Sequence, residues 1–284
     1  MLNIRVMCAT DIPVGMRLKA QAGWNQLEAD WRRFLEMQPD GCFIAELDSK
    51  PVGTTMACTF GPIAWIAMVL VDAEVRGRGI GKALMQHALA FLDRKDVRTV
   101  RLDATPLGQP LYEKLGFKVE YTLARHEGTL RAAVDFPFDD CPERVTSARA
   151  TDFEDIFRLD ESVSHTDRRS FLTRLFRECP EDVRIVRQDG KIAGYRAVRS
   201  GANALQIGPC MAAASAGPLL LADAWLSHVG QRVFVDIPVQ SQTATHFAQK
   251  MGLTAQRQLV RMTRGPTVNE DVSRLWASSG PELG

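Results

Sequence analysis

An internal repeat constrains the fold of this 284-residue chain more than any other feature of its sequence. Three blocks of the first half recur in the same order in the second half. The paired blocks are "MCATDIPVGMRL" (7–18) with "ARATDFEDIFRL" (148–159), "FIAELDSKPVG" (43–53) with "RIVRQDGKIAG" (184–194), and "LYEKLGFKVEYTLAR" (111–125) with "FAQKMGLTAQRQLVR" (247–261). Collinear matches of this kind indicate two tandem copies of one domain.

The repeat also predicts where the chain divides. We expect a first domain over 1–138 and a second over 145–284, joined around "FPFDDCPE" (136–143). The chain is well above the roughly 150 residues of a typical domain, which favours the same division. In the last segment, Val272, Leu275 and Trp276 would share one face of a helix, so we expect this tail to pack back onto the protein.

Hydrophobic patterning within the first copy predicts an α/β fold of the α+β type. The expected strands are 2–7, 42–47, 52–60, 63–71, 99–104 and one after Gly116, and the expected helices are 12–22, 25–37, 79–93 and 109–115. Hairpin-connected strands followed by a strand–helix–strand unit imply a mixed, mostly antiparallel sheet flanked by helices. The repeat extends this expectation to the second copy.

Composition excludes several classes of function. The formal net charge is +1, so no overall field favours nucleic acid or an acidic membrane. No uncharged apolar run approaches the ~18 residues that a membrane helix needs, and the amino terminus lacks a signal-peptide pattern. The six cysteines form no CxxC pair and the five histidines no HxxxH pattern, so we expect reduced thiols, no metal and a cytoplasmic protein. The oligomeric state stays open.

The stretch "VRGRGIGKALM" (75–85) lies between an apolar strand and an amphipathic helix. A helix start exposes unpaired N–H groups, and glycines let an anion approach them closely. A Walker A loop would need a glycine at 76 and a hydroxyl at 83, where the chain has Arg76 and Ala83. The dinucleotide pattern GxGxxG fails as well, because its last glycine would fall on Lys82.

The pattern that does match is R-x-x-G-x-G, formed by Arg76, Gly79 and Gly81. Together with "LYEKLGF" (111–117), one strand further on, it resembles the GCN5-related N-acetyltransferase (GNAT) family. The resemblance covers about residues 1–125 through these two motifs, and 145–262 only through the internal repeat.

This resemblance implies a binding site for acetyl-coenzyme A. The pyrophosphate would lie on the backbone of the loop and helix start, and the strand edge before it would bind the pantetheine amide. The cofactor-binding residues so implied are Val69, Leu70, Val71, Arg76, Gly77, Arg78, Gly79, Ile80, Gly81, Lys82 and Ala83. Thr105 occupies the place where the family pattern usually has asparagine.

Chemistry follows from the same resemblance, which makes Tyr112 the candidate general acid. Its ordinary pKa of about 10 exceeds the ~8.5 of a cysteine-like thiol, so it stays protonated and is available to donate a proton to the departing sulfur. Main-chain N–H groups near Leu70 and Val71 are candidate oxyanion donors. The base stays open among Asp30, Glu36, Asp72, Asp103 and a chain of water molecules.

In this family the acceptor usually lies between the first two helices and the sheet. That placement suggests Trp24, Asn25 and Gln26 as substrate-binding residues, although Trp24 and Asn25 could equally be a packed helix entry. The second copy lacks these motifs: Ala212 and Ser215 stand opposite Arg76 and Gly79, and Ala248 opposite Tyr112. We therefore expect a degenerate second domain that retains at most a vestigial cleft.

The leading hypothesis is an acetyl-coenzyme A-dependent N-acetyltransferase. It would act on a primary amine of a small molecule or peptide, with its active site in the first domain. A non-catalytic acyl-coenzyme A-binding sensor is the alternative, and a structural module made of two relic domains is a third possibility.

Overall fold

The computed structural model describes residues 1–131 and 144–284, so the linker predicted at 136–143 lies outside the described residues. Within them the same order of elements occurs twice, which is the structural form of the repeat. The first half contains β1 (Leu2–Val6), α1 (Ile12–Gln21), α2 (Glu28–Met37), β2 (Cys42–Leu47), β3 (Lys50–Phe60), β4 (Ile63–Val71), α3 (Ile80–Asp93), β5 (Thr99–Ala104), α4 (Gln109–Lys114) and β6 (Lys118–Thr129).

The second half repeats this order and adds one strand. It contains β7 (Val145–Ser147), α5 (Phe153–Ser164), α6 (Arg169–Glu178), β8 (Arg184–Gln188), β9 (Lys191–Arg199), β10 (Leu205–Ala212), α7 (Ala216–Ser227), β11 (Arg232–Pro238), α8 (Gln242–Lys250), β12 (Thr254–Arg264) and the extra β13 (Leu275–Ala277). The predicted mixed, mostly antiparallel sheet flanked by helices is confirmed, since among the described strands only β4–β5 and β10–β11 pair in parallel.

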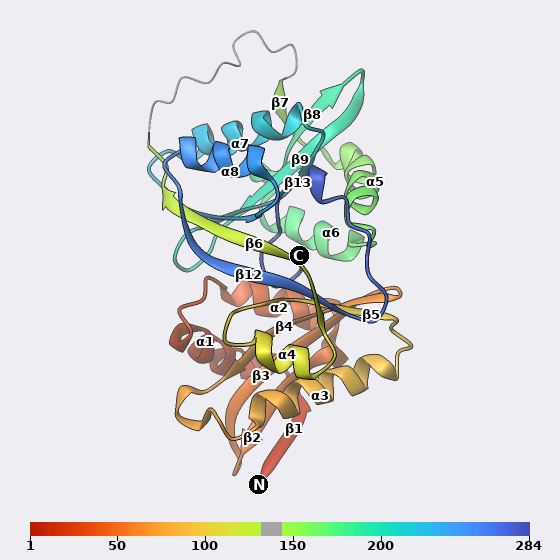
Figure 1. Cartoon of the computed structure of the whole chain (residues 1–284), viewed down its shortest axis with the longest axis vertical. Coiled ribbons are helices and arrows are strands. Elements are labelled where there is room, and N and C mark those ends of the chain that lie inside the picture. Colours follow the sequence, from red (N-terminus) through yellow and green to blue (C-terminus); the bar gives the residue numbers. More distant parts are fainter. Residues whose placement is uncertain (132–143) are drawn as a thin grey trace.

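The two halves exchange strands at their junction. In the described residues the strands form one 13-stranded sheet, in which β12 lies between β5 and β6, and β6 lies between β12 and β11. β12 pairs with β5 from Val260–Ala104 to Arg264–Val100, so a strand of the second half completes the sheet of the first. Figure 1 shows β6 and β12 side by side between the two lobes.

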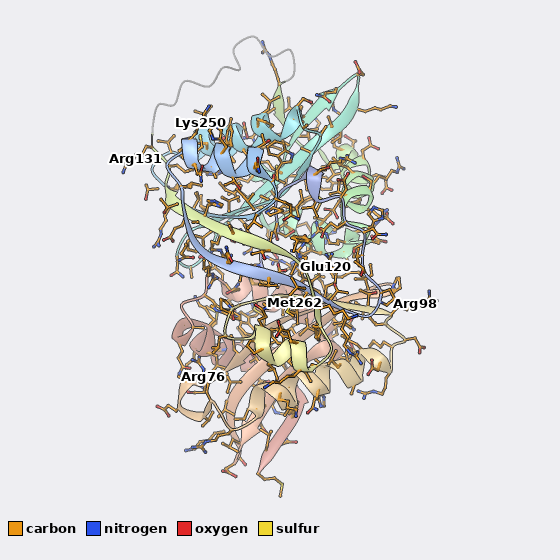
Figure 2. All side chains as sticks on the ribbon, viewed as in Figure 1. Arg76, Arg98, Glu120, Arg131, Lys250 and Met262 are labelled. Carbon is orange, nitrogen blue, oxygen red and sulfur yellow. The ribbon has the colours of Figure 1, made fainter. Side chains whose placement is uncertain are left out.

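Side chains of the exchanged strand belong to the core of the other half. Met262 of β12 packs among residues of α3, α4 and β5, and Figure 2 places it where β12 crosses the lower lobe. Another apolar cluster joins the α1–α2 side of the first half to the α5–α6 side of the second, with Trp31 and Phe34 packed in the same cluster as Phe171 and Phe176. The halves therefore share their interior and are not merely adjacent.

The carboxy-terminal segment departs from its sequence-based prediction. Residues 275–277 form strand β13, which pairs with β10, and not the predicted helix. Packing of Leu275 and Trp276 against the protein is confirmed, because both side chains are buried. Figure 1 shows that the chain ends near the middle of the molecule, between the lobes.

None of the helices in the part of the chain that the structure describes has the length and apolar character needed to span a membrane. Cys42, Cys58 and Cys210 are buried free thiols, and burial raises the pKa of the Cys58 and Cys210 thiols to about 12.

Candidate active site

A cavity of about 760 Å³ opens in the first half where β4 and β5 separate. The two strands pair in parallel only from Ile63–Thr99 to Trp65–Arg101. Beyond Trp65 both strands line the cavity, β4 with 66–71 and β5 with Leu102 and Asp103. The edge of β4 that faces away from β3 thereby offers its backbone groups to the cavity.

A β-bulge accompanies this separation. Thr54 pairs with Leu70 and Met56 with Ala67, so β4 has one residue more than β3 over the same stretch. Met68 has a φ of 52°, and its carbonyl oxygen accepts a hydrogen bond of 2.8 Å from the Thr54 hydroxyl. Bulges of this kind bend a strand and redirect its side chains, so the bulge reshapes β4 where the strand borders the cavity.

The loop before α3 forms a bare backbone cradle at one end of the cavity. Gly77 and Gly79 have φ values of 77° and 79°, which L residues with side chains rarely adopt. Across the described hydrogen bonds, no N–H from Gly79 to Lys82 has a protein acceptor, and the first that does belongs to Ala83, 3.0 Å from the Gly79 oxygen. Four free N–H groups at the positive end of a 14-residue helix are suited to donate hydrogen bonds to the oxygens of a phosphate.

Three basic residues lie near this cradle, and two of them line the cavity. Arg76 and Lys82 line the cavity, and the Arg76 Nε donates a 3.1 Å hydrogen bond to the Val71 oxygen, which fixes the side chain beside the loop. Arg76 lies at the surface of the first half, as Figure 2 shows. Arg78 is also exposed, but its side chain does not line the cavity, and Ala83 is likewise outside the wall.

Tyr112 enters the cavity from α4. Its ring packs against Gly108, where an added Cβ would come within 2.8 Å of the ring, and against Phe117 at a centroid distance of 6.1 Å. Burial raises the pKa of Tyr112 to about 12. In the described structure its hydroxyl makes no hydrogen bond to protein, which leaves the O–H available to a bound molecule.

The other predicted cofactor residues occupy the same wall. Val69, Leu70, Val71, Gly77, Gly79, Ile80, Gly81 and Thr105 all line the cavity. The Thr105 hydroxyl accepts a 3.3 Å hydrogen bond from the Gly108 N–H, so it closes the turn before α4.

Only two of the three residues predicted to bind the acceptor line the cavity. Trp24 and Gln26 line the cavity on the side of α1 and α2. Asn25 instead points into the second half, where its Oδ1 accepts hydrogen bonds from the Asn203 and Ala204 N–H groups at 2.8 and 3.1 Å. Its Nδ2 donates to the Ala204 oxygen at 3.0 Å. Asn25 thus joins the two halves, and it does not line the cavity.

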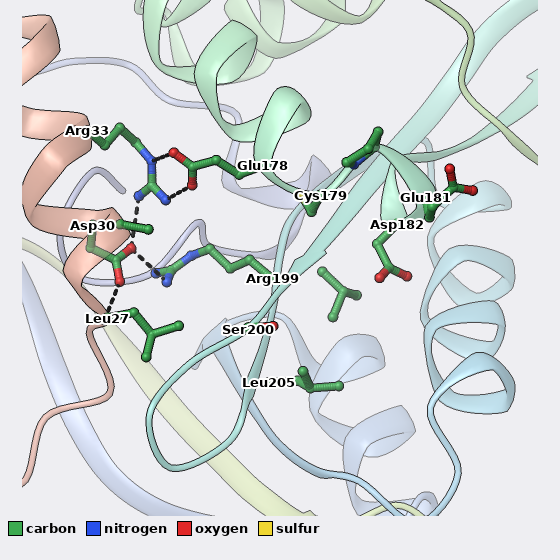
Figure 3. Close-up of a pocket in the computed structure, with 13 residues that line it drawn as sticks. Leu27, Asp30, Arg33, Glu178, Cys179, Glu181, Asp182, Arg199, Ser200 and Leu205 are labelled. Atoms are coloured by element: carbon green, nitrogen blue, oxygen red, sulfur yellow. Dashed lines mark hydrogen bonds and ion pairs between the residues drawn. The ribbon is translucent and has the colours of Figure 1, made fainter.

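Three of the four carboxylates considered as a base lie elsewhere. Asp30 is buried between Arg33 and Arg199, at 2.9 and 3.0 Å, in a separate cavity of about 320 Å³ where Arg33 also binds Glu178 (Figure 3). Because its carboxylate joins α2 to β9 across the junction, Asp30 has a structural function.

Glu36 and Asp72 do not line the cavity either. Glu36 is bound by Arg174, and Asp72 by Arg17. Only Asp103 of the four lines the cavity, where Arg261 of β12 engages both of its oxygens at 2.9 Å. Burial raises the pKa of Asp103, and the Arg261 guanidinium opposes this rise.

Sequence reasoning missed the contribution of the second half to this cavity. Arg257 and Leu259 of β12, together with Pro281 and Glu282 of the tail, form part of its wall. Their presence follows from the strand exchange and from β13. No local motif marks these residues, since their position depends on the distant pairing of β12 with β5 and β6, and of β13 with β10.

The corresponding slot of the second half is filled by the protein itself. β10 and β11 pair at three positions and then separate, as β4 and β5 do. β13 pairs with β10 beyond this point, and the Ser278 N–H bonds to the Asp236 oxygen of β11 at 2.9 Å. The Trp276 ring lies against Gly217, the counterpart of Gly81, so that an added Cβ would come within 1.9 Å of it. The expected vestigial cleft is therefore occupied by Trp276.

Comparison with known proteins agrees with this architecture. Residues 16–117 match the model "Acetyltransferase (GNAT) family", and residues 156–277 match "Acetyltransferase (GNAT) domain". The chain is 30% identical over 205 residues to the uncharacterized N-acetyltransferase YitH of Bacillus subtilis, covering 70% of this chain and 69% of that protein. It is 24% identical to holothin acyltransferase of a Pseudoalteromonas species, over 92% of this chain and 87% of the relative.

A solved structure has the same fold over the whole length. The crystal structure of a putative acetyltransferase from Pyrococcus horikoshii superposes with a TM-score of 0.83 at 23% identity, covering 100% of this chain and 96% of that one. Both halves of the chain, its bulged and separated strands and its glycine cradle thus lead to one conclusion: the protein is a tandem member of the GNAT family of acetyltransferases.

Proposed function

We propose that this acyltransferase moves an acetyl group from acetyl-coenzyme A to a primary amine of a small molecule or peptide, in the cavity of its first half. The observation that carries the proposal is the cradle of free N–H groups from Gly79 to Lys82. Such a cradle matches the requirements of a diphosphate: N–H donors, positive charge and glycines that leave the backbone accessible.

Different residues of the cavity would bind different parts of acetyl-coenzyme A. Arg76 and Lys82 would add charge to the cradle, and the β4 edge from Val69 to Val71 would hold the pantetheine chain by backbone hydrogen bonds. When bound, acetyl-coenzyme A supplies the acetyl group as a thioester. Fixing both reactants in one cavity converts a bimolecular reaction into an effectively unimolecular one.

Tyr112 is proposed as the proton donor to the leaving thiolate. With a pKa of about 12 its hydroxyl keeps its proton throughout the neutral range. The two cavity carboxylates, Asp103 and Glu282, already accept hydrogen bonds from Arg261 and Arg199, so we assign neither of them as the base. We therefore expect the acceptor to react as its free amine, with kcat/KM rising as pH approaches the pKa of that amine.

Two measurements test the proposal. Calorimetric titration with coenzyme A tests the cradle, and release of coenzyme A from acetyl-coenzyme A with a panel of primary amines tests transfer. Binding of coenzyme A without turnover of any amine would favour a non-catalytic acyl-coenzyme A sensor over a transferase. Absence of coenzyme A binding would refute both hypotheses. Arg158→Gln, an exposed substitution on α5, is a matched control.

A further inference from the structure

Arg257 differs from the buried arginines of this protein because, among the residues that the structure describes, it has no carboxylate partner. Arg101, Arg125, Arg168 and Arg261 are buried, and each forms an ion pair of 2.6–2.9 Å with an aspartate or glutamate. Arg257 is partly buried in the cavity wall, and its Nε is fully covered without a hydrogen-bond acceptor. Throughout 1–131 and 144–284, Arg257 forms no ion pair.

The carboxylates nearest to Arg257 are already engaged by other groups. Arg125, its cross-strand neighbour on β6, binds both oxygens of Asp236 at 2.7 Å. Glu282 accepts hydrogen bonds from Arg199, at 3.2 Å, and from Gln26.

Glu127, the remaining nearby acid, pairs with Arg232 at 2.9 Å. Burial, and then the Arg125 charge, lower the pKa of Arg257. A buried cation without a partner costs free energy unless a ligand supplies the opposite charge.

The strand register shows which reactant would meet this cation. Side chains alternate along a strand, so Arg257 shares a face of β12 with Leu259 and Arg261. Met262, on the other face, packs with α3 and α4, the helices that border the cradle. Arg257 therefore lies on the face of β12 opposite to Met262, and it lines the cavity together with Trp24 and Gln26.

We propose that Arg257 binds a carboxylate of the acceptor, so that the substrate is a primary amine that also carries a carboxylate group, such as an amino acid. This inference rests on the proposed function for the position of the amine. The planar guanidinium can donate two parallel hydrogen bonds to a carboxylate, which gives orientation as well as charge. A neutral amine of the same length would leave the guanidinium unpaired.

The test compares amines with and without a carboxylate, each at the same concentration of free amine, because a carboxamide lowers the pKa of a nearby amine. Glycine, β-alanine and γ-aminobutyrate, each beside its carboxamide, would be assayed for acetylation and titrated calorimetrically into the protein without cofactor. A hydrogen-bonded charge pair of this kind implies a preference for the acids of about tenfold to hundredfold. Arg257→Gln should abolish this preference, Arg257→Lys should keep part of it, and Arg158→Gln should keep all of it. Coenzyme A titration of each variant verifies that it is folded.

The outcomes separate the inference from the proposed function. Equal acetylation of acids and carboxamides would overturn the inference while acetyl transfer stands. Binding of the acids that depends on Arg257, without any acetylation, would support the inference and remove the proposed transferase activity. Binding of no amino acid in either assay would refute a carboxylate site at Arg257.

Discussion

Replacing Gly79 with alanine tests whether the backbone of the cradle, and not its side chains, makes the anion site. Gly79 has a φ of 79°, and a Cβ added there would meet no atom within 4 Å. The cost is therefore backbone strain alone, about 1–2 kcal/mol for an L residue in the left-handed region. Gly190→Ala is the matched control, because Gly190 has a φ of 77° and equally empty surroundings but lies in the turn between β8 and β9, outside the cavity wall.

This strain must be expressed in one of two measurable quantities. If the alanine introduced by Gly79→Ala keeps the left-handed conformation, the free energy of unfolding falls by that amount. If it relaxes to negative φ, binding must restore the strained loop, and coenzyme A affinity falls about 5- to 30-fold. Urea denaturation and calorimetry measure the two losses, which together should come to about 1–2 kcal/mol. An equal loss of coenzyme A affinity for Gly190→Ala, or no loss in either quantity for Gly79→Ala, would refute the reasoning.

Three further predictions concern the chemistry and the junction. Tyr112→Phe should lower kcat by about 10²-fold with unchanged coenzyme A affinity. Because burial raises the pKa of Tyr112 to about 12, the wild-type pH profile should show no fall that depends on this residue between about pH 8 and 10; such a fall would contradict its role. Asp236→Ala should cost about 3–5 kcal/mol in chemical denaturation by leaving Arg125 buried and unpaired, and a loss below about 1 kcal/mol would show that the pair is solvated. Trp276→Ala should cost about 3–5 kcal/mol because it empties the slot of the second half; wild-type stability would mean that the slot collapses without penalty.

The sequence predicted those parts of the site that depend on local geometry. The cradle and Tyr112 lie in short motifs whose structure follows from a few neighbouring residues, namely glycines at positive φ and a helix start. The order of strands and helices was likewise predictable, because hydrophobic periodicity is local.

Features that depend on distant pairing could not be predicted. Asn25 lies beside two cavity residues in the sequence, but its side-chain amide is hydrogen-bonded to the backbone of residues 203 and 204 in the second half. Residues 275–277 have an amphipathic pattern that fits a helix, yet the open edge of β10 makes them a strand. Arg257 has no local signal at all, since its place depends on β12 crossing to the other half.

The crossing of β12 also determines how this chain can be shortened or divided. A fragment ending before residue 145 would lack the strand between β5 and β6, which stand about 9–10 Å apart with β12 in place. Such a fragment must either close that gap by sliding two strands together or borrow the missing strand from another copy. Although its own slot is filled, the second half thus supplies a strand that the sheet of the first half needs in its observed form.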